Sequence, residues 1–127
     1  MIFSVIIPLY NKRNFIRTTL RSVLSQTVSR FEVIVVDDGS TDGGAEIVEA
    51  LRDSRIRLVR QENQGVAAAR NRGAEEARFS WIAFLDGDDL WRADHLSSLT
   101  LATEQFPDVG FISTRWHFLS ESEPKNS

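Results

Sequence analysis

The sequence predicts a single α/β domain built on an open, mostly parallel sheet with helices on both faces. Short segments rich in β-branched and aromatic residues alternate with amphipathic segments along the chain. This alternation is typical of repeated strand–helix–strand units, whose connections are right-handed. The 127 residues match the length of one domain, and a hydrophobic content of 42% is enough for one core.

Five short segments have the composition of strands. Val5, Ile6 and Ile7 form the centre of the first one, before Pro8 interrupts the apolar run. The five predicted strands cover residues 3–7, 31–36, 56–59, 81–85 and 109–112. The first, second and fourth are nearly continuous in apolar residues, so we expect both of their faces to be covered.

Amphipathic helices are predicted between these strands. Apolar residues recur at helical spacing after each of the first four strands. The four apolar stripes are Ile16, Leu20, Val23 and Leu24; Ile47, Val48 and Leu51; Val66, Ala69, Gly73 and Ala77; and Leu96, Leu99 and Phe106. The domain is expected to cover residues 1–119, and the polar segment 120–127 is expected to fray.

Composition and charge exclude several classes of protein. The formal net charge is -3, whereas a nucleic-acid-binding scaffold needs a basic excess. The chain has no cysteine, which excludes disulfides, thiol catalysis and Cys-ligated zinc. The N-terminal segment lacks the features of a signal peptide, and no apolar run approaches the roughly 20 residues that span a bilayer. We expect a cytoplasmic protein, with peripheral attachment to a membrane left open.

Ligands of open α/β sheets bind at the carboxyl ends of the strands, where acidic residues gather in this sequence. Asp86, Asp88 and Asp89 directly follow the fourth predicted strand, and close carboxylates repel one another unless a cation intervenes. Side chains two residues apart in extended backbone point to the same side, so Asp86 and Asp88 are candidate ligands of one ion. Ligation by oxygen alone suits Mg²⁺ or Mn²⁺ and not zinc. The alternatives are a solvated turn and, less favoured, a Ca²⁺ loop.

Further candidate residues reach the same predicted edge. Asp37 and Asp38 end the second strand, either as a turn before a helix or with one carboxylate placed to accept a hydrogen bond from a nucleobase or ribose. Gly65 opens the third helix, whose N-terminus favours an anion such as a diphosphate. Arg70 is either the partner of that anion or a solvated surface group. Tyr10 either stacks on a base or covers the sheet edge.

Taken together, four segments resemble the family 2 glycosyltransferases in their order and spacing. They are VIIPLYN at 5–11, VVDDGSTD at 35–42, NQG at 63–65 with ARNRG at 69–73, and FLDGDD at 84–89. Members of this family have the GT-A fold and transfer a sugar from a nucleotide diphosphate donor, usually with inversion at the anomeric carbon. The resemblance implies a metal-dependent glycosyltransferase that uses a nucleotide sugar, with a UDP-sugar favoured, and an acceptor that the sequence does not identify.

The resemblance also implies roles for individual residues on the side of the nucleotide. Pro8 and Tyr10 would lie beside the base, and Asp38 would contact the edge of a uracil or an equivalent base. Arg70 would lie near the base or the diphosphate. Gly65, by the argument from helix N-termini above, would allow close approach of the diphosphate.

The acidic segment matches the Asp-x-Asp motif of the family at Asp86 and Asp88. In that motif the first carboxylate contacts ribose or metal-bound water, and the last binds the cation directly. The cation, Mn²⁺ or Mg²⁺, offsets charge on the departing diphosphate. Catalytic domains of the family are longer, and the acidic residue that deprotonates the acceptor comes from a later segment, so the catalytic base is not assigned. Asp89 is a poor candidate because it lies on the donor side.

Two further expectations complete the sequence-based interpretation. A second hypothesis is a non-catalytic module that holds a nucleotide or nucleotide sugar without turnover. Exposed apolar surface is also expected to mediate homo-oligomerisation. The residues of this surface are Val109, Phe111, Ile112, Trp116 and Phe118.

Overall fold

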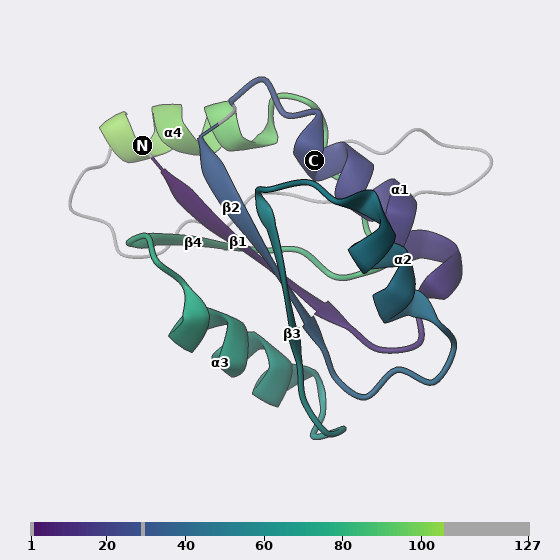
Figure 1. Ribbon diagram of the computed structural model, residues 1–127. Coiled ribbons are helices and arrows are strands. Elements are labelled where there is room, and N and C mark those ends of the chain that lie inside the picture. The colour runs from purple at the N-terminus through teal and green to yellow at the C-terminus, as the bar shows by residue number, and fades with distance from the viewer. Residues whose placement is uncertain (1, 29, 106–127) are drawn as a thin grey trace.

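The computed structural model describes residues 2–28 and 30–105, and it confirms the predicted α/β class (Figure 1). Four parallel strands form one sheet in the order β3-β2-β1-β4. The strands are β1 (Phe3–Leu9), β2 (Phe31–Asp37), β3 (Ile56–Arg60) and β4 (Trp81–Phe84). The helices are α1 (Arg13–Leu24), α2 (Gly44–Leu51), α3 (Val66–Glu76) and α4 (His95–Gln105). Each strand is followed by a helix, as predicted.

Some expectations fall on parts of the chain that the structure does not describe. These are the strand at 109–112, Phe106 of the fourth stripe, the apolar residues expected to mediate oligomerisation, and the polar segment 120–127. Within residues 2–28 and 30–105, no helix has the length and apolar character needed to cross a membrane.

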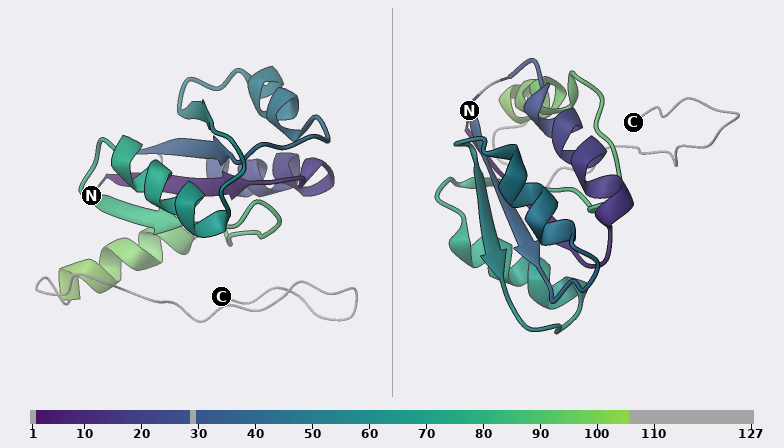
Figure 2. Two further views of the ribbon diagram at one scale, coloured as in Figure 1. Left: turned by 90° about the horizontal axis from the view of Figure 1, so that it is seen from below. Right: turned by 45° about the vertical axis from the view of Figure 1, so that its right-hand side comes forward.

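The molecule has three layers, in which the sheet lies between helices on its two faces (Figure 2). On one face, Val5 and Ile7 of β1 belong to a core cluster that also contains Leu20 of α1 and Leu96 of α4. On the other face, Ile6 packs in a smaller cluster with residues of β2 and with α3. Because successive strand residues point to opposite faces, the apolar run of β1 supplies both cores. Every residue of β1 is buried.

The packing of α3 against the sheet is unusually close at Gly73. A Cβ atom added there would lie 2.2 Å from Cγ2 of Ile6, well inside van der Waals contact. Ala69, one turn earlier, is also buried, whereas Val66 is 52% exposed. The predicted apolar stripe is therefore wrong at Val66, the first residue of α3, whose side chain is largely exposed.

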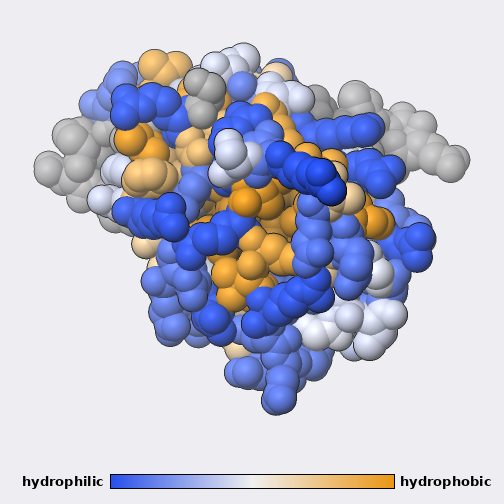
Figure 3. Space-filling model, viewed as in Figure 1, coloured by the Kyte–Doolittle hydropathy of each residue, from blue (hydrophilic) through white to orange (hydrophobic). Residues whose placement is uncertain are grey.

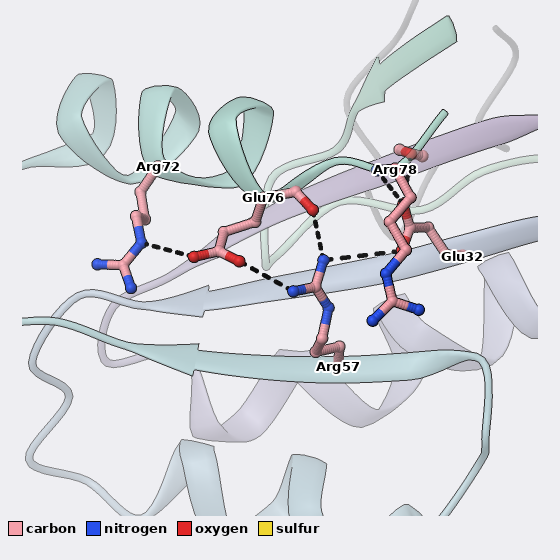
Figure 4. Close-up of polar contacts among 6 residues, drawn as sticks. Glu32, Arg57, Arg72, Glu76 and Arg78 are labelled. Carbon is pink, nitrogen blue, oxygen red and sulfur yellow. Dashed lines mark hydrogen bonds and ion pairs between the residues drawn. The ribbon is translucent and has the colours of Figure 1, made fainter. Parts of the chain in front are cut away.

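A polar network holds the other end of α3 to the sheet (Figure 4). Arg57 of β3 donates from Nη1 to Oε2 of Glu76 at 2.9 Å, and it also contacts Glu32 of β2 at 3.8 Å. Glu32 in turn accepts hydrogen bonds from Oγ of Ser4 at 2.6 Å and from the backbone N–H of Arg78 at 2.7 Å. The network joins β1, β2 and β3 to the C-terminal end of α3, and so fixes the direction in which α3 runs.

The first strand is longer than predicted, because it continues through Pro8 to Leu9. A proline in a central strand removes one donor from the ladder. The carbonyl of Ile6 accepts a hydrogen bond from the N–H of Leu85, so alternate residues of β1, Pro8 among them, face the β4 side. Pairing with β4 ends at Ile6 and Phe84, so Pro8 lies where β1 has no partner strand on that side.

The fourth strand is not covered on both faces, which corrects the prediction for residues 81–85. Ile82 is 37% exposed and Phe84 is 49% exposed, whereas Ala83 between them is buried. The strand lies at an edge of the sheet as the structure describes it, and apolar composition alone does not reveal which face has a covering helix.

The opposite edge of the sheet is formed by β3. Figure 3 shows the face of the molecule on which β3 lies, with apolar surface in the middle and hydrophilic side chains around it. Arg60, at the end of the strand, pairs with Glu46 at 3.6 Å and with Glu49. Charged side chains on an edge strand disfavour pairing with another chain.

Candidate functional site

A cavity of about 530 Å³ lies at the carboxyl ends of β1, β2 and β4, where ligands of open α/β sheets bind. Its lining includes the seven residues to which the sequence analysis gave a role in binding the nucleotide sugar or the metal. These are Pro8, Tyr10, Asp38, Gly65, Arg70, Asp86 and Asp88. The structure thus places side chains from four separate segments around one space, while the roles assigned to them stay predictions.

The wall of the cavity beside β1 is formed by Pro8, Leu9 and Tyr10. Tyr10 follows the last residue of the strand and is 47% exposed. A ring that mainly covered the sheet edge would be largely buried. Tyr10 therefore lines the cavity and keeps about half of its surface accessible to solvent.

Asp38 lines the cavity and is only 3% exposed. Oδ1 accepts hydrogen bonds from Nε2 of Gln61 at 2.9 Å and from the N–H of Gln64 at 2.8 Å. Oδ2 accepts from the N–H of Gly65 at 2.9 Å and, at 3.4 Å, from Nδ2 of Asn63. Burial by itself raises the pKa of Asp38, but these hydrogen bonds outweigh burial and hold the pKa below its usual value.

A carboxylate has about four lone-pair positions that can accept hydrogen bonds, and donors of this chain already occupy those of Asp38. The side chain therefore organises the connection between β3 and α3, including the residue at which α3 begins. A ligand that bonds to Asp38 must replace one of these donors, and the contact with Asn63 is the longest. Asp37, by contrast, is not part of the cavity lining: its Oδ1 accepts from the N–H of Ser40 at 3.1 Å.

The acidic motif forms a turn at the rim of the cavity. The N–H of Asp89 donates to the carbonyl of Asp86 at 3.0 Å, which closes the turn. Asp86 and Asp88 thus reach the same cavity from a turn, and the sequence argument from extended backbone was wrong about the reason. A Cβ atom on Gly87 would lie 3.0 Å from the carbonyl oxygen of Pro8, so a larger residue would require the turn and β1 to separate by a few tenths of an ångström.

Each carboxylate of the motif pairs with a cation from another element. Nη2 of Arg70, on α3, lies 2.9 Å from Oδ1 of Asp86. Nζ of Lys12, in the loop after β1, lies 3.1 Å from Oδ2 of Asp88. All four side chains are partly exposed, which makes these ion pairs weak and exchangeable.

Two features of these cations were not anticipated from the sequence. Lys12 lines the cavity although it was not singled out; its only signal was a basic residue in the loop after the first strand. Nε of Arg70 is buried and has no hydrogen-bond partner among the residues that the structure describes. A buried donor without an acceptor is costly.

The donor set of Asp86 and Asp88 fits a divalent cation of the Mg²⁺ or Mn²⁺ type. Both residues offer carboxylate oxygens at one cavity, and these ions complete their shells with water and phosphate. Across residues 2–28 and 30–105, no group of three or more His, Cys, Asp or Glu side chains is arranged to hold a metal by itself. Asp86 and Asp88 thus offer part of a coordination shell, and the ion pair of Lys12 uses only Oδ2 of Asp88.

Comparison with known proteins identifies the family of this chain. The family model described as "Glycosyl transferase family 2" matches residues 4–126. The uncharacterized glycosyltransferase EpsJ of Bacillus subtilis is 44% identical over 104 residues, which cover 80% of this chain and 30% of EpsJ. In a crystal structure of residues 1–349 of S. aureus TarS in complex with UDP-GlcNAc, 32% of the TarS chain superposes on 83% of this chain, with a TM-score of 0.76 and 33% identity.

A second solved structure adds a metal. The mannosyltransferase PcManGT from Pyrobaculum calidifontis, in complex with GDP-Man and Mn²⁺, matches with a TM-score of 0.71 and 32% identity. The match covers 77% of this chain and 31% of PcManGT. The chain thus spans about a third of the length of the proteins that it resembles.

The likeness includes both the amino-acid sequence and the three-dimensional fold, and the family model covers nearly the whole sequence. We conclude that this chain belongs to glycosyltransferase family 2 and has the GT-A type of α/β fold.

Proposed function

We propose that this chain binds the donor of a metal-dependent, inverting glycosyltransferase, and that the donor is a nucleoside diphosphate sugar with UDP as the favoured nucleotide. The observation that carries the proposal is the meeting of an exposed aromatic residue, three carboxylates and two cations in one cavity. The complex of TarS with UDP-GlcNAc supports the choice of UDP.

The base would lie between the β1 wall and Asp38. Tyr10 offers an exposed ring for stacking, and Pro8 continues the apolar wall. Asp38 would accept a hydrogen bond from a base N–H in place of the bond from Asn63, the longest of those that it accepts. Its lowered pKa keeps the carboxylate ionised, and an ionised carboxylate makes the stronger hydrogen bond.

The diphosphate would lie between α3 and the acidic turn. Gly65 and Val66 place the N-terminus of α3 at the cavity, and Arg70 brings a positive charge to its lining. Asp86 and Asp88 would hold Mn²⁺ or Mg²⁺, whose chemistry is to offset negative charge on the diphosphate as it departs. The presence of Mn²⁺ with GDP-Man in PcManGT supports a divalent cation.

In the proposed reaction, an acceptor hydroxyl oxygen forms a bond to the anomeric carbon of the sugar. The bond from that carbon to the β-phosphate oxygen breaks, and its electron pair leaves with the diphosphate. The proton of the hydroxyl goes to a base that we assign to none of the described residues. Asp89 lies beside the metal motif and is not part of the cavity lining.

Calorimetric titration of UDP into the 127-residue chain, with and without Mn²⁺, tests the proposal. We expect binding only with Mn²⁺, and a loss of at least about tenfold in affinity for Asp88→Ala, because a charge-assisted contact is removed. Glu75→Ala is the matched control: it removes the same charge from an exposed position of α3 outside the cavity lining, and it should bind UDP as the parent chain does. Failure of the parent chain to bind either UDP or GDP in both conditions would overturn the proposal.

A further inference from the structure

Two loops meet beside the cavity, and a set of hydrogen bonds joins them. We call this set the loop clasp: it links Asn11 and Arg13, after β1, to Ser40, Thr41 and Asp42, after β2. We propose that Asn11 is a positioning residue that sets the affinity for the donor through this clasp. The inference rests on the proposed function, and none of the clasp residues lines the cavity.

Asn11 is the centre of the first half of the clasp. Its φ of 51° lies in the left-handed region, which asparagine tolerates better than most residues. Its N–H donates to Oγ of Ser40 at 3.0 Å. Its Oδ1 accepts from the N–H of Thr41 at 2.8 Å and from Oγ1 of Thr41 at 3.4 Å. One residue thus uses both its backbone and its side chain to hold the neighbouring loop.

Asp42 is the centre of the second half. Its Oδ2 accepts from the N–H of Arg13 and its Oδ1 from the N–H of Gly44, both at 2.9 Å. Neither the N-cap residue of α1, Lys12, nor that of α2, Gly43, makes a side-chain cap hydrogen bond. One carboxylate therefore serves the first turns of two helices, where free N–H groups and the helix dipoles favour negative charge.

The electrostatics of Asp42 match this role. Burial raises its pKa, but the N–H groups of Arg13 and Gly44 and the positive charge of Arg13 outweigh burial, so the pKa lies below its usual value. The guanidinium of Arg13 also donates to the backbone carbonyl of Asp42 at 3.2 Å. The loop after β2 is thus held to the start of α1 at several points.

The clasp determines where three cavity residues lie relative to one another. Tyr10 directly precedes Asn11, and Lys12 lies between Asn11 and Arg13, the two residues that the clasp fixes. Asp38 begins the loop that the clasp holds on the other side, and its N–H donates to the carbonyl of Leu9 at 2.8 Å. A loop ordered before binding loses less conformational entropy when the ligand arrives.

Substitutions at Asn11 separate the hydrogen bonds from the backbone conformation. All three variants keep the backbone N–H that donates to Ser40. Asn11→Asp also keeps an acceptor for Thr41 and tolerates positive φ, Asn11→Gly loses the acceptor but tolerates positive φ, and Asn11→Ala loses both features. Loss of the acceptor should weaken UDP binding in Mn²⁺ about fivefold or more in both the Gly and the Ala variants. The Asp variant should bind within about threefold of the parent chain.

The Gly and Ala variants should lose UDP affinity to a similar extent but differ in stability. If Asn11 acted only through the stability of the chain, affinity and stability would change together. The melting temperature of the Gly variant should exceed that of the Ala variant, because alanine at positive φ is strained, although both lose affinity. The control is Asp53→Asn, which weakens a carboxylate acceptor for the N–H of Arg55 in the turn before β3, at the end of the sheet away from the cavity. It should lower the melting temperature and leave UDP affinity unchanged.

Hydrogen exchange of the backbone N–H of Thr41 gives a readout that does not need a ligand. In Asn11→Gly this amide should exchange at least about fivefold faster than in the parent chain, since it loses its acceptor. If the parent chain binds no nucleotide, the proposed function fails and the exchange rate alone decides on the clasp. Unchanged exchange, or parent-like UDP affinity in a folded Asn11→Gly chain, would overturn the inference.

Discussion

The close contact between Gly73 of α3 and Ile6 of β1 makes Gly73→Ala the sharpest test of how α3 packs. The added methyl group would lie 2.2 Å from Cγ2 of Ile6 and 3.3 Å from its Cβ and Cδ1. Ile6 has no exposed surface, so it has no solvent-filled space into which to move. Relief of the contact requires a shift of α3 or of the side chain of Ile6 within a closely packed core.

Two opposing terms set the magnitude. Overpacking of a well-packed core costs about 1–3 kcal/mol. Replacing glycine by alanine inside a helix gains about 1 kcal/mol. A contact of 2.2 Å is so short that the overpacking cost here should lie in the upper part of that range, at about 2–3 kcal/mol. After the gain in helix propensity is subtracted, we expect Gly73→Ala to lower the free energy of unfolding by about 1–2 kcal/mol, which corresponds to roughly 4–8 °C in melting temperature.

Urea unfolding followed by circular dichroism measures this change, and two further variants identify its cause. Asn71→Ala, at an exposed position of the same helix, should be neutral or slightly stabilising because it changes helix propensity alone. In Ile6→Ala combined with Gly73→Ala, the space left by the isoleucine accepts the new methyl group. The loss in the double variant should be smaller than the sum of the two single losses.

A Gly73→Ala chain as stable as the parent chain would refute the packing argument. Additive losses in the double variant would refute the specific contact with Ile6. Because α3 also carries Arg70, a stable variant with a shifted helix should bind UDP more weakly, which links this packing contact to the cavity.

Two more predictions concern charge. Lys12→Met should weaken UDP binding in Mn²⁺ by about tenfold through loss of a cavity cation, whereas its effect on the free energy of unfolding should stay below about 1 kcal/mol, because its ion pair with Asp88 is partly exposed. Arg17→Met, at an exposed position of α1, is the calorimetric control, and equal UDP affinity in the two variants would contradict a role for Lys12. The second prediction follows from the lowered pKa of Asp38 in the folded chain: its contribution to stability is complete above its unfolded pKa of about 4 and is lost as pH falls through the lower folded value. The free energy of unfolding should therefore fall less below about pH 4 in Asp38→Asn than in the parent chain, and identical slopes in urea unfolding would count against this account.

Much of the architecture followed from local patterns in the sequence. The apolar runs at 3–7 and 31–36 predicted buried parallel strands, and the spacing of Ile16, Leu20 and Val23 predicted the buried face of α1. Strand-end positions also predicted which residues meet, because all carboxyl ends of a parallel sheet lie at one edge. For that reason the seven candidate residues could be named before their distances were known.

The departures have a common cause, which is contact between segments distant in the sequence. Exposure of Ile82 and Phe84 depends on which face of β4 has a covering helix, and composition does not record this. The turn at Asp86 depends on how closely Gly87 approaches β1. Lys12 is one basic residue among 15 until the fold places its ammonium group beside Asp88.

The sequence by itself determined the order of strands and helices, the family motifs and the edge of the sheet at which polar residues gather, because each of these depends on residues close together along the chain. The tertiary structure decided which groups touch. It showed that the donors of the Gln61–Gly65 segment use the acceptor capacity of Asp38, and that Asn11 and Asp42 join two loops across about 30 residues of sequence. Hydrogen bonds and ion pairs depend on distances of a few ångströms between such segments, and only the folded chain sets those distances.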